Sequence, residues 1–165
     1  MSSSTPEALT AAVITVSDSC ARGERTDASG PAVAQVLTKH NFPIAGTTTV
    51  PDEQGAIQQA LLSWTARVRL VVTTGGTGIA PRDVTPEATR AVCERILEGV
   101  AERMRSEGAK QAPLAALSRA VCGVRGQAVI LNLPGSPAGA TQSLESVIHL
   151  LPHALQLLSG NTRHE

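Results

Sequence analysis

Aromatic side chains are almost absent from this sequence. Phe42 and Trp64 are the only two among 165 residues, and there is no tyrosine. Proteins that bind single-stranded nucleic acid stack bases on aromatic rings, so the sequence speaks against that class. The 14 basic and 14 acidic residues balance to zero net charge. This balance disfavours binding of nucleic acid or an anionic membrane through an overall positive field.

Long hydrophobic runs are missing as well. No apolar stretch approaches the roughly 18 to 20 residues that a membrane span needs, and residues 1–6 lack the basic and apolar regions of a secretory signal. Cys20, Cys93 and Cys122 form neither a CxxC pair nor a disulfide framework. We interpret them as reduced thiols and predict a cytoplasmic protein that binds no membrane.

The most informative stretch that is present runs through residues 70–89. Residues 70–74 are apolar and β-branched without alternation, which is typical of a strand buried in a parallel sheet. Three glycines in the next four residues allow a sharp turn and a close approach of backbone N–H groups to a ligand. Thr85 and Pro86 predict a helix with Thr85 as N-cap, its positive end facing the loop. The pattern favours a phosphate-binding loop over a simple chain reversal.

Strand and helix patterns alternate along the rest of the chain. Further strands are predicted at 11–16, 44–50 and 128–133, with a short one at 119–124. Helices are predicted at 28–41, around 54–64, and at 86–97, 99–106 and 137–158, the last split by Pro152 near Leu151. This order predicts an α/β fold, a three-layer α/β/α sandwich with a mostly parallel central sheet. One domain is expected over 11–160, with a flexible N-terminal tail at 1–10 and a C-terminal tail at 161–165.

Polar residues follow the predicted parallel strands at the point where each one ends. In such folds ligands bind at the carboxyl ends of the strands. We therefore expect Asp18, Asp52, the glycine loop with Asp83, and residues 134–136 to share one cleft. The loop is neither a P-loop nor a dinucleotide fingerprint, because GxxxxGK[ST] and GxGxxG are both absent. Phosphate charge would then be met by backbone N–H groups, a helix end, Arg82, or Mg²⁺ held on Asp52 and Asp83.

Each candidate residue also has a purely structural explanation. Asp52 could only cap the helix that follows it, and Asp83 could only complement a helix dipole. Ser136 is a plausible helix cap whether or not it also contacts a ligand. Turn or surface roles remain open alternatives for Ser17, Asp18, Ser19 and Arg119. The residues alone therefore predict a domain that binds a phosphorylated small molecule, with Mg²⁺ as a candidate partner.

A series of short motifs carries a family resemblance from Ala12 to Gly160. In chain order they are TVSDS (15–19), RG (22–23), DASGP (27–31), VPDE (50–53), TTGGTG (73–78), PRDVTPEAT (81–89), SR (118–119) and NLPGSP (132–137). Together they resemble the molybdopterin adenylyltransferases of molybdenum-cofactor synthesis, the Mog/MoaB type, which includes the G domains of gephyrin and its plant counterpart.

The resemblance implies an enzyme that transfers AMP from ATP to the phosphate of molybdopterin with Mg²⁺. It implies catalytic or magnesium-associated roles for Asp52 and Asp83, a homotrimer, and hand-over of the product to a metal-insertion enzyme. With the loop-end residues above, the predicted substrate-binding set is Ser17, Asp18, Gly75, Gly76, Thr77, Gly78, Arg82, Thr85, Pro134, Gly135 and Ser136. The alternative is a non-catalytic carrier or scaffold that binds molybdopterin, which ATP-dependent pyrophosphate release would distinguish from the enzyme.

Overall fold

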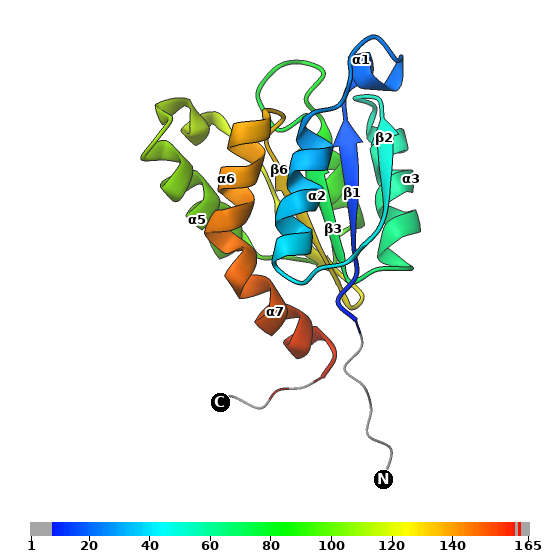
Figure 1. The fold of residues 1–165 in the computed structure, drawn as a ribbon, viewed down its shortest axis with the longest axis vertical. Coiled ribbons are helices and arrows are strands. Elements are labelled where there is room, and N and C mark those ends of the chain that lie inside the picture. Colours follow the sequence, from blue (N-terminus) through cyan, green and yellow to red (C-terminus); the bar gives the residue numbers. More distant parts are fainter. Residues whose placement is uncertain (1–7, 161, 163–165) are drawn as a thin grey trace.

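A parallel core of four strands organises the molecule (Figure 1). The computed structural model describes residues 8–160 and 162. Strand β1 (Ala11–Val16) pairs in parallel with β2 (Ile44–Val50) on one side and with β3 (Leu70–Thr74) on the other. Strand β6 (Ala128–Leu133) continues the parallel sheet beside β3. All four strands have the bounds that the sequence predicts.

The far edge of the sheet is antiparallel. Strand β5 (Cys122–Arg125) pairs with β6, and the two-residue β4 (Arg95–Ile96) pairs with β5. Gly126, with φ of 58°, makes the tight turn from β5 to β6. The order β2-β1-β3-β6-β5-β4 gives six strands in the described residues, so the prediction of a mostly parallel sheet is confirmed.

Two sequence predictions in this region are wrong at their boundaries. The helix predicted at 86–97 ends earlier, because α4 spans Thr85–Val92 and the chain then joins the sheet edge. The backbone N–H of Glu94 donates to Val124 and that of Leu97 donates to Cys122, each at 2.8 Å. The strand predicted at 119–124 begins only at Cys122.

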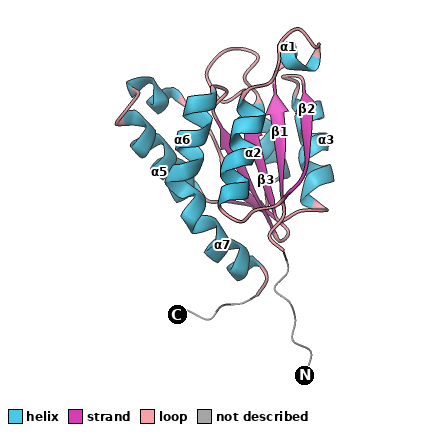
Figure 2. Cartoon of the chain, viewed as in Figure 1, coloured by secondary structure: helices cyan, strands magenta, loops and turns pink. Residues whose placement is uncertain are grey.

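Helices cover both faces of the sheet, as the three layers require (Figure 2). On one face lie α2 (Ser29–Lys39), α5 (Glu98–Ala109), α6 (Pro137–Val147) and α7 (Leu151–Leu158). On the other face lie α3 (Gln54–Thr65) and α4. Neighbouring β1 residues belong to opposite cores, since Val13 packs with the first group and Ile14 with the second.

Short helical elements fill the connections. Helix α1 (Asp18–Ala21) follows β1, η1 (Pro113–Leu117) lies in the predicted loop at 109–118, and η2 (Ile148–Leu150) separates α6 from α7. Pro152 is at the start of α7, so the predicted split of the closing helix is confirmed. Helix α5 is longer than the predicted 99–106.

The chain ends are only partly described. Residues 1–7 of the predicted N-terminal tail, and all of the predicted tail at 161–165 except Thr162, lie outside the described residues. Leu9 packs against the core, and Thr10 accepts a hydrogen bond from the N–H of Arg69 at 3.1 Å. Ordered structure therefore begins before the predicted boundary at residue 11. Within the described ranges, no helix combines the length and apolarity needed to cross a membrane.

Candidate active site

The glycine loop follows β3 and has a backbone that other residues rarely adopt. Gly75 and Gly76 have φ of 93° and 69°. Gly75 also packs tightly between two strand ends, because a Cβ there would meet the backbone carbonyl of Val16, and a Cβ on Gly135 would lie 3.4 Å from the Gly75 Cα. The predicted sharp turn is confirmed.

Three consecutive N–H groups of this loop are available to a ligand. Gly75 donates to the carbonyl of Leu133 at 3.0 Å, whereas the N–H groups of Gly76, Thr77 and Gly78 have no acceptor among residues 8–160 and 162. Successive free amide donors on a glycine turn form a concavity that binds anions. The loop can therefore receive phosphate oxygens without a lysine.

Thr85 hydrogen-bonds the glycine loop and does not cap helix α4. The N-cap of α4 is Val84, so the predicted N-cap role of Thr85 is wrong. Thr85 is fully buried. Its hydroxyl donates to the carbonyl of Gly75 at 3.0 Å, and its N–H donates to the carbonyl of Gly76 at 3.2 Å. These bonds exist because the chain folds back beneath the loop before the helix starts. They fix the helix start against the glycines.

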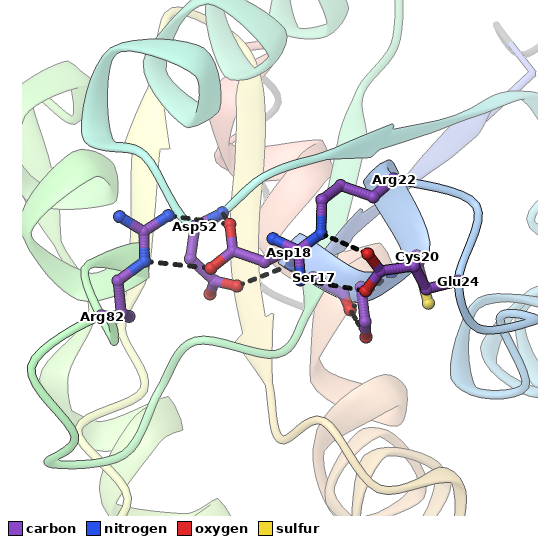
Figure 3. A network of polar contacts seen from close by, with 8 residues as sticks. Ser17, Asp18, Cys20, Arg22, Glu24, Asp52 and Arg82 are labelled. Atoms are coloured by element: carbon purple, nitrogen blue, oxygen red, sulfur yellow. Dashed lines mark hydrogen bonds and ion pairs between the residues drawn. The ribbon is translucent and has the colours of Figure 1, made fainter.

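Asp18 and Asp52 tie the ends of β1 and β2 together (Figure 3). The N–H of Asp18 donates to Asp52 Oδ2, and the N–H of Asp52 donates to Asp18 Oδ1, both at 3.0 Å. The N-cap of α3 is Glu53, and no side-chain hydrogen bond caps that helix. The alternative that Asp52 is only a helix cap is therefore wrong.

Arg82 reaches back from the loop beyond the glycines to the same pair. Its Nε donates to Asp18 Oδ2 at 2.9 Å and its Nη2 donates to Oδ1 at 2.8 Å, a two-pronged ion pair (Figure 3). The side chain of Arg82 is 60% exposed, whereas the Asp18 side chain is only 24% exposed. Arg82 therefore places a positive charge next to the Asp18 carboxylate, on the exposed side of the site.

Asp52 and Asp83 border the glycine loop from two directions. A Cβ on Gly76 would lie 3.1 Å from Asp52 Oδ1, and one on Gly78 would lie 2.9 Å from Asp83 Oδ2. The Asp83 carboxylate accepts one hydrogen bond, from the N–H of Ala80 at 3.0 Å. Both carboxylates therefore lie beside the loop whose amides are free.

The carboxylates influence one another electrostatically. Burial raises the pKa of Asp52, whereas the hydrogen bond from the Asp18 N–H lowers it. The negative charges of Asp18 and Asp83 raise this pKa further. The hydrogen bond from Arg82 lowers the pKa of Asp18, helped by the one to the Asp52 backbone. A bound cation would relieve the repulsion at Asp52.

The donor set fits magnesium that is shared with a substrate. Within the described ranges, no cluster of three or more His, Cys, Asp or Glu side chains is arranged to enclose a metal. Mg²⁺ commonly uses only one or two carboxylates together with substrate phosphates and water. Asp52 and Asp83 at the edge of an amide-lined loop meet that requirement, while both oxygens of Asp18 are already bonded to Arg82.

Two hollows lie beside the glycine loop, in place of the single predicted cleft. One has a volume of about 300 Å³ and lies between the loop, η1 and α6; the other, of about 360 Å³, lies between the ends of β1 and β3 and the start of α2. The contact of Gly75 with Gly135 separates them, and Ser136 borders both. Neither hollow is lined by Asp52 or Asp83.

The predicted binding residues divide between these places. Thr77, Gly78 and Pro134 line the first hollow, and Ser17, Gly75 and Gly135 line the second. Gly76, Asp18 and Arg82 lie with the carboxylates. Ser136 is also the cap that the sequence predicts, since its Oγ accepts from the N–H of Gly139 at 3.1 Å.

Sequence reasoning missed several residues that shape the second hollow. Thr15 Oγ1 donates to Asp27 Oδ2 at 2.6 Å, and Asp27 Oδ1 accepts from the N–H of Gly30 at 3.1 Å. Ser29 donates to the carbonyl of Gly135. The available signal is the motif DASGP, which is part of the family resemblance and precedes the predicted helix, but no binding role is predicted for its residues.

Arg119 was also assigned incompletely. The sequence is compatible with a phosphate clamp or a surface cation at this position. In the structure, Nε of Arg119 donates to the carbonyl of Gly78 and Nη2 donates to the carbonyl of Asp83, both at 2.8 Å. Its third nitrogen, Nη1, pairs with Glu87. The side chain therefore bonds the loop itself.

Comparisons with known proteins agree with this arrangement. A family model described as a probable molybdopterin binding domain matches residues 12–153. The molybdopterin adenylyltransferase of Helicobacter pylori strain J99 is 40% identical over 153 residues, covering 90% of this chain and 87% of that protein. The molybdenum cofactor synthesis protein cinnamon of Drosophila melanogaster is 44% identical over 159 residues, but the chain spans only 26% of its length.

A solved structure shows the same fold. The molybdopterin biosynthesis enzyme MoaB of Thermus thermophilus superposes with a TM-score of 0.87 at 50% sequence identity. The match covers 92% of this chain and 97% of that one. The strand order and the helical layers described above are therefore those of a known architecture.

Proposed function

The chain belongs to the family of probable molybdopterin binding domains, and from this premise we propose that it is a molybdopterin adenylyltransferase. It would transfer AMP from ATP to the phosphate of molybdopterin, giving adenylylated molybdopterin and pyrophosphate. A relative with this name, 40% identical, is covered over 87% of its length. The observation that carries the proposal is the row of three free amides, Gly76 to Gly78, beside two carboxylates.

The geometry supports a reaction between two bound substrates. The hollows on either side of the Gly75–Gly135 contact both reach Ser136, so groups held in them would meet at this point. A phosphate oxygen of molybdopterin attacks the α-phosphorus of ATP, and the bond from that phosphorus to the bridging oxygen breaks. Pyrophosphate leaves with the electron pair. The amides of Gly76 to Gly78 donate to phosphate oxygens as charge builds on them.

Asp52 and Asp83 are the residues that would hold Mg²⁺ in this site. When bound, the ion supplies positive charge that offsets the negative charge on the phosphates. Arg82 adds a second positive charge beside them, and Asp18 keeps its guanidinium in place. The remaining parts of the proposal, a cytoplasmic homotrimer that hands its product to a metal-insertion enzyme, rest on the family resemblance.

A single-turnover assay tests the function. Purified protein is mixed with molybdopterin, Mg²⁺ and ATP labelled in the α-phosphate, and both pyrophosphate and adenylylated molybdopterin are followed. We expect both products in equal amounts, and neither with ATP in which a methylene replaces the α,β-bridging oxygen. Binding of molybdopterin without cleavage of ATP would instead support the non-catalytic carrier.

The acid limb of the pH profile is expected to depend on Arg82. Burial holds the pKa of Asp52 above its ordinary value and the charge of Arg82 opposes this effect, so Arg82→Gln should raise that pKa further. Because the ionised carboxylate is the active form, activity falls as the pH drops through the pKa, and a higher pKa moves this loss to higher pH. The measurement is kcat/KM against pH. Arg22→Gln is the control, because Arg22 pairs with Glu24 on the neighbouring loop; equal shifts in both variants would contradict the assignment to Asp52.

A further inference from the structure

Arg119 hydrogen-bonds both ends of the loop that carries Asp83. Its Nε and Nη2 bind the carbonyls of Gly78 and Asp83, which stand at the two ends of residues 78–83. Its backbone N–H donates to the carbonyl of Thr77 at 2.8 Å. One residue, distant in sequence, thus bonds both sides of the segment.

Within this segment, the side chain of Arg82 also bonds Asp18, and the remaining bonds are internal. The N–H of Asp83 donates to the carbonyl of Ala80 at 2.9 Å, and the Asp83 carboxylate accepts from the N–H of Ala80. Ile79, next to Ala80, is 70% exposed, so this part of the segment has little packing. The position of the Asp83 carboxylate beside Gly78 therefore depends on how firmly its backbone is held.

Each of the three side-chain nitrogens of Arg119 already donates to a group of the protein. The third nitrogen, Nη1, pairs with Glu87 in the first turn of α4. Although burial acts to raise the pKa of Glu87, the hydrogen bond from Arg119 brings it below its usual value. The guanidinium is planar and directs its donors outward in a fixed fork, which a lysine ammonium cannot reproduce.

We propose that Arg119 is a positioning residue for the reaction, which holds the Asp83 carboxylate against the glycine loop. The inference rests on the proposed function for its catalytic consequence and on the three hydrogen-bonded contacts for its structural part. Arg119 would act through Asp83 and would not touch the substrates.

The steady-state kinetics of Arg119→Lys test the catalytic part of the inference. Replacement keeps the charge but breaks the fork, so we expect kcat to fall by about 10- to 100-fold, the usual loss when a supporting contact is removed. The KM values for ATP and molybdopterin should stay within about threefold, because no substrate contact is lost. Arg103→Lys is the matched control, since Arg103 lies on the surface and, among residues 8–160 and 162, hydrogen-bonds only the carbonyl of Ser146.

A double-mutant cycle separates positioning from direct contact. If Arg119 acts through Asp83, adding Arg119→Lys to Asp83→Asn should lower kcat by less than about twofold more. If the two losses multiply, or if Arg119→Lys raises KM and leaves kcat unchanged, Arg119 contacts substrate and the inference fails.

Hydrogen exchange tests the structural part without any substrate. The amides of Ala80 and Asp83 are hydrogen-bonded within the segment, so their exchange reports how firmly it is held. We expect both to exchange at least about tenfold faster in Arg119→Lys and at the wild-type rate in Arg103→Lys. Unchanged exchange in Arg119→Lys would overturn the inference. Faster exchange in a protein that never releases pyrophosphate would uphold the loop contact and reject only the proposed function.

Discussion

Asp52→Asn and Asp83→Asn are each expected to lower turnover on the order of 100-fold or more, because either change removes a charge that faces the phosphates. Asparagine has nearly the same shape and keeps an oxygen that can accept the bond from the N–H of Asp18 or of Ala80. The loops should therefore keep their conformation. The measurement is the single-turnover rate of pyrophosphate release at saturating substrates.

The same change at Asp52 should not weaken the fold. Burial and two neighbouring carboxylates raise the pKa of Asp52, so the ionised form is disfavoured in the folded protein. Asp52→Asn should then melt at an equal or higher temperature than the wild type above that pKa. The difference should disappear at pH well below 3.8, the ordinary value, where the carboxyl is neutral in both states.

Glu53→Gln provides the control for both measurements. Glu53 is the next residue, is exposed and makes no capping bond to α3. Its replacement should leave turnover within about twofold of the wild type, since most exposed positions tolerate such changes. Unchanged turnover in folded Asp52→Asn and Asp83→Asn would show that the two carboxylates only join loops. The carrier function would then fit better than the enzyme.

The parallel strands could be predicted because their signal is local and strong. Residues 70–74 are apolar or β-branched, and residues 128–133 are apolar except for Asn132, a pattern typical of a fully buried strand of this length. Topology then followed from the alternation with helices. The strand at the sheet edge could not be predicted, because Arg95 and Ile96 show no strand pattern in the sequence. Only pairing with β5, far along the chain, makes them a strand.

The region of the site could be predicted, but its internal bonds could not. Strand ends place Asp18, Asp52 and the glycine loop at one edge without knowledge of any contact. Which side chains pair depends on residues far apart in sequence: Arg82 bonds Asp18 across 64 positions, and Arg119 bonds Gly78 across 41. Local patterns carry no information about such partners. Thr85 illustrates the result, since a sequence typical of an N-cap instead supports the loop.

Gly76→Ala is expected to weaken binding of both molybdopterin and ATP by about tenfold or more, and to destabilise the fold by about 1–2 kcal/mol, the strain of a left-handed backbone at a residue with a Cβ. Gly76 has φ of 69°, and a Cβ would press on the hydroxyl of Thr85 and lie 3.1 Å from Asp52 Oδ1. Relief of this contact requires a shift of the loop, which turns the free amides away from the phosphates. Affinities would be measured by calorimetry on each substrate alone.

Gly55→Ala is the matched control, because the added methyl group in α3 meets no atom within 4 Å. That variant should gain about 0.5–1 kcal/mol in stability, the ordinary effect of alanine in a helix, and bind both substrates as the wild type does. If Gly76→Ala instead loses stability but keeps its affinities, the conformation of the loop matters only for folding. The phosphates would then have to be held elsewhere, and the three free amides would no longer support the proposed function.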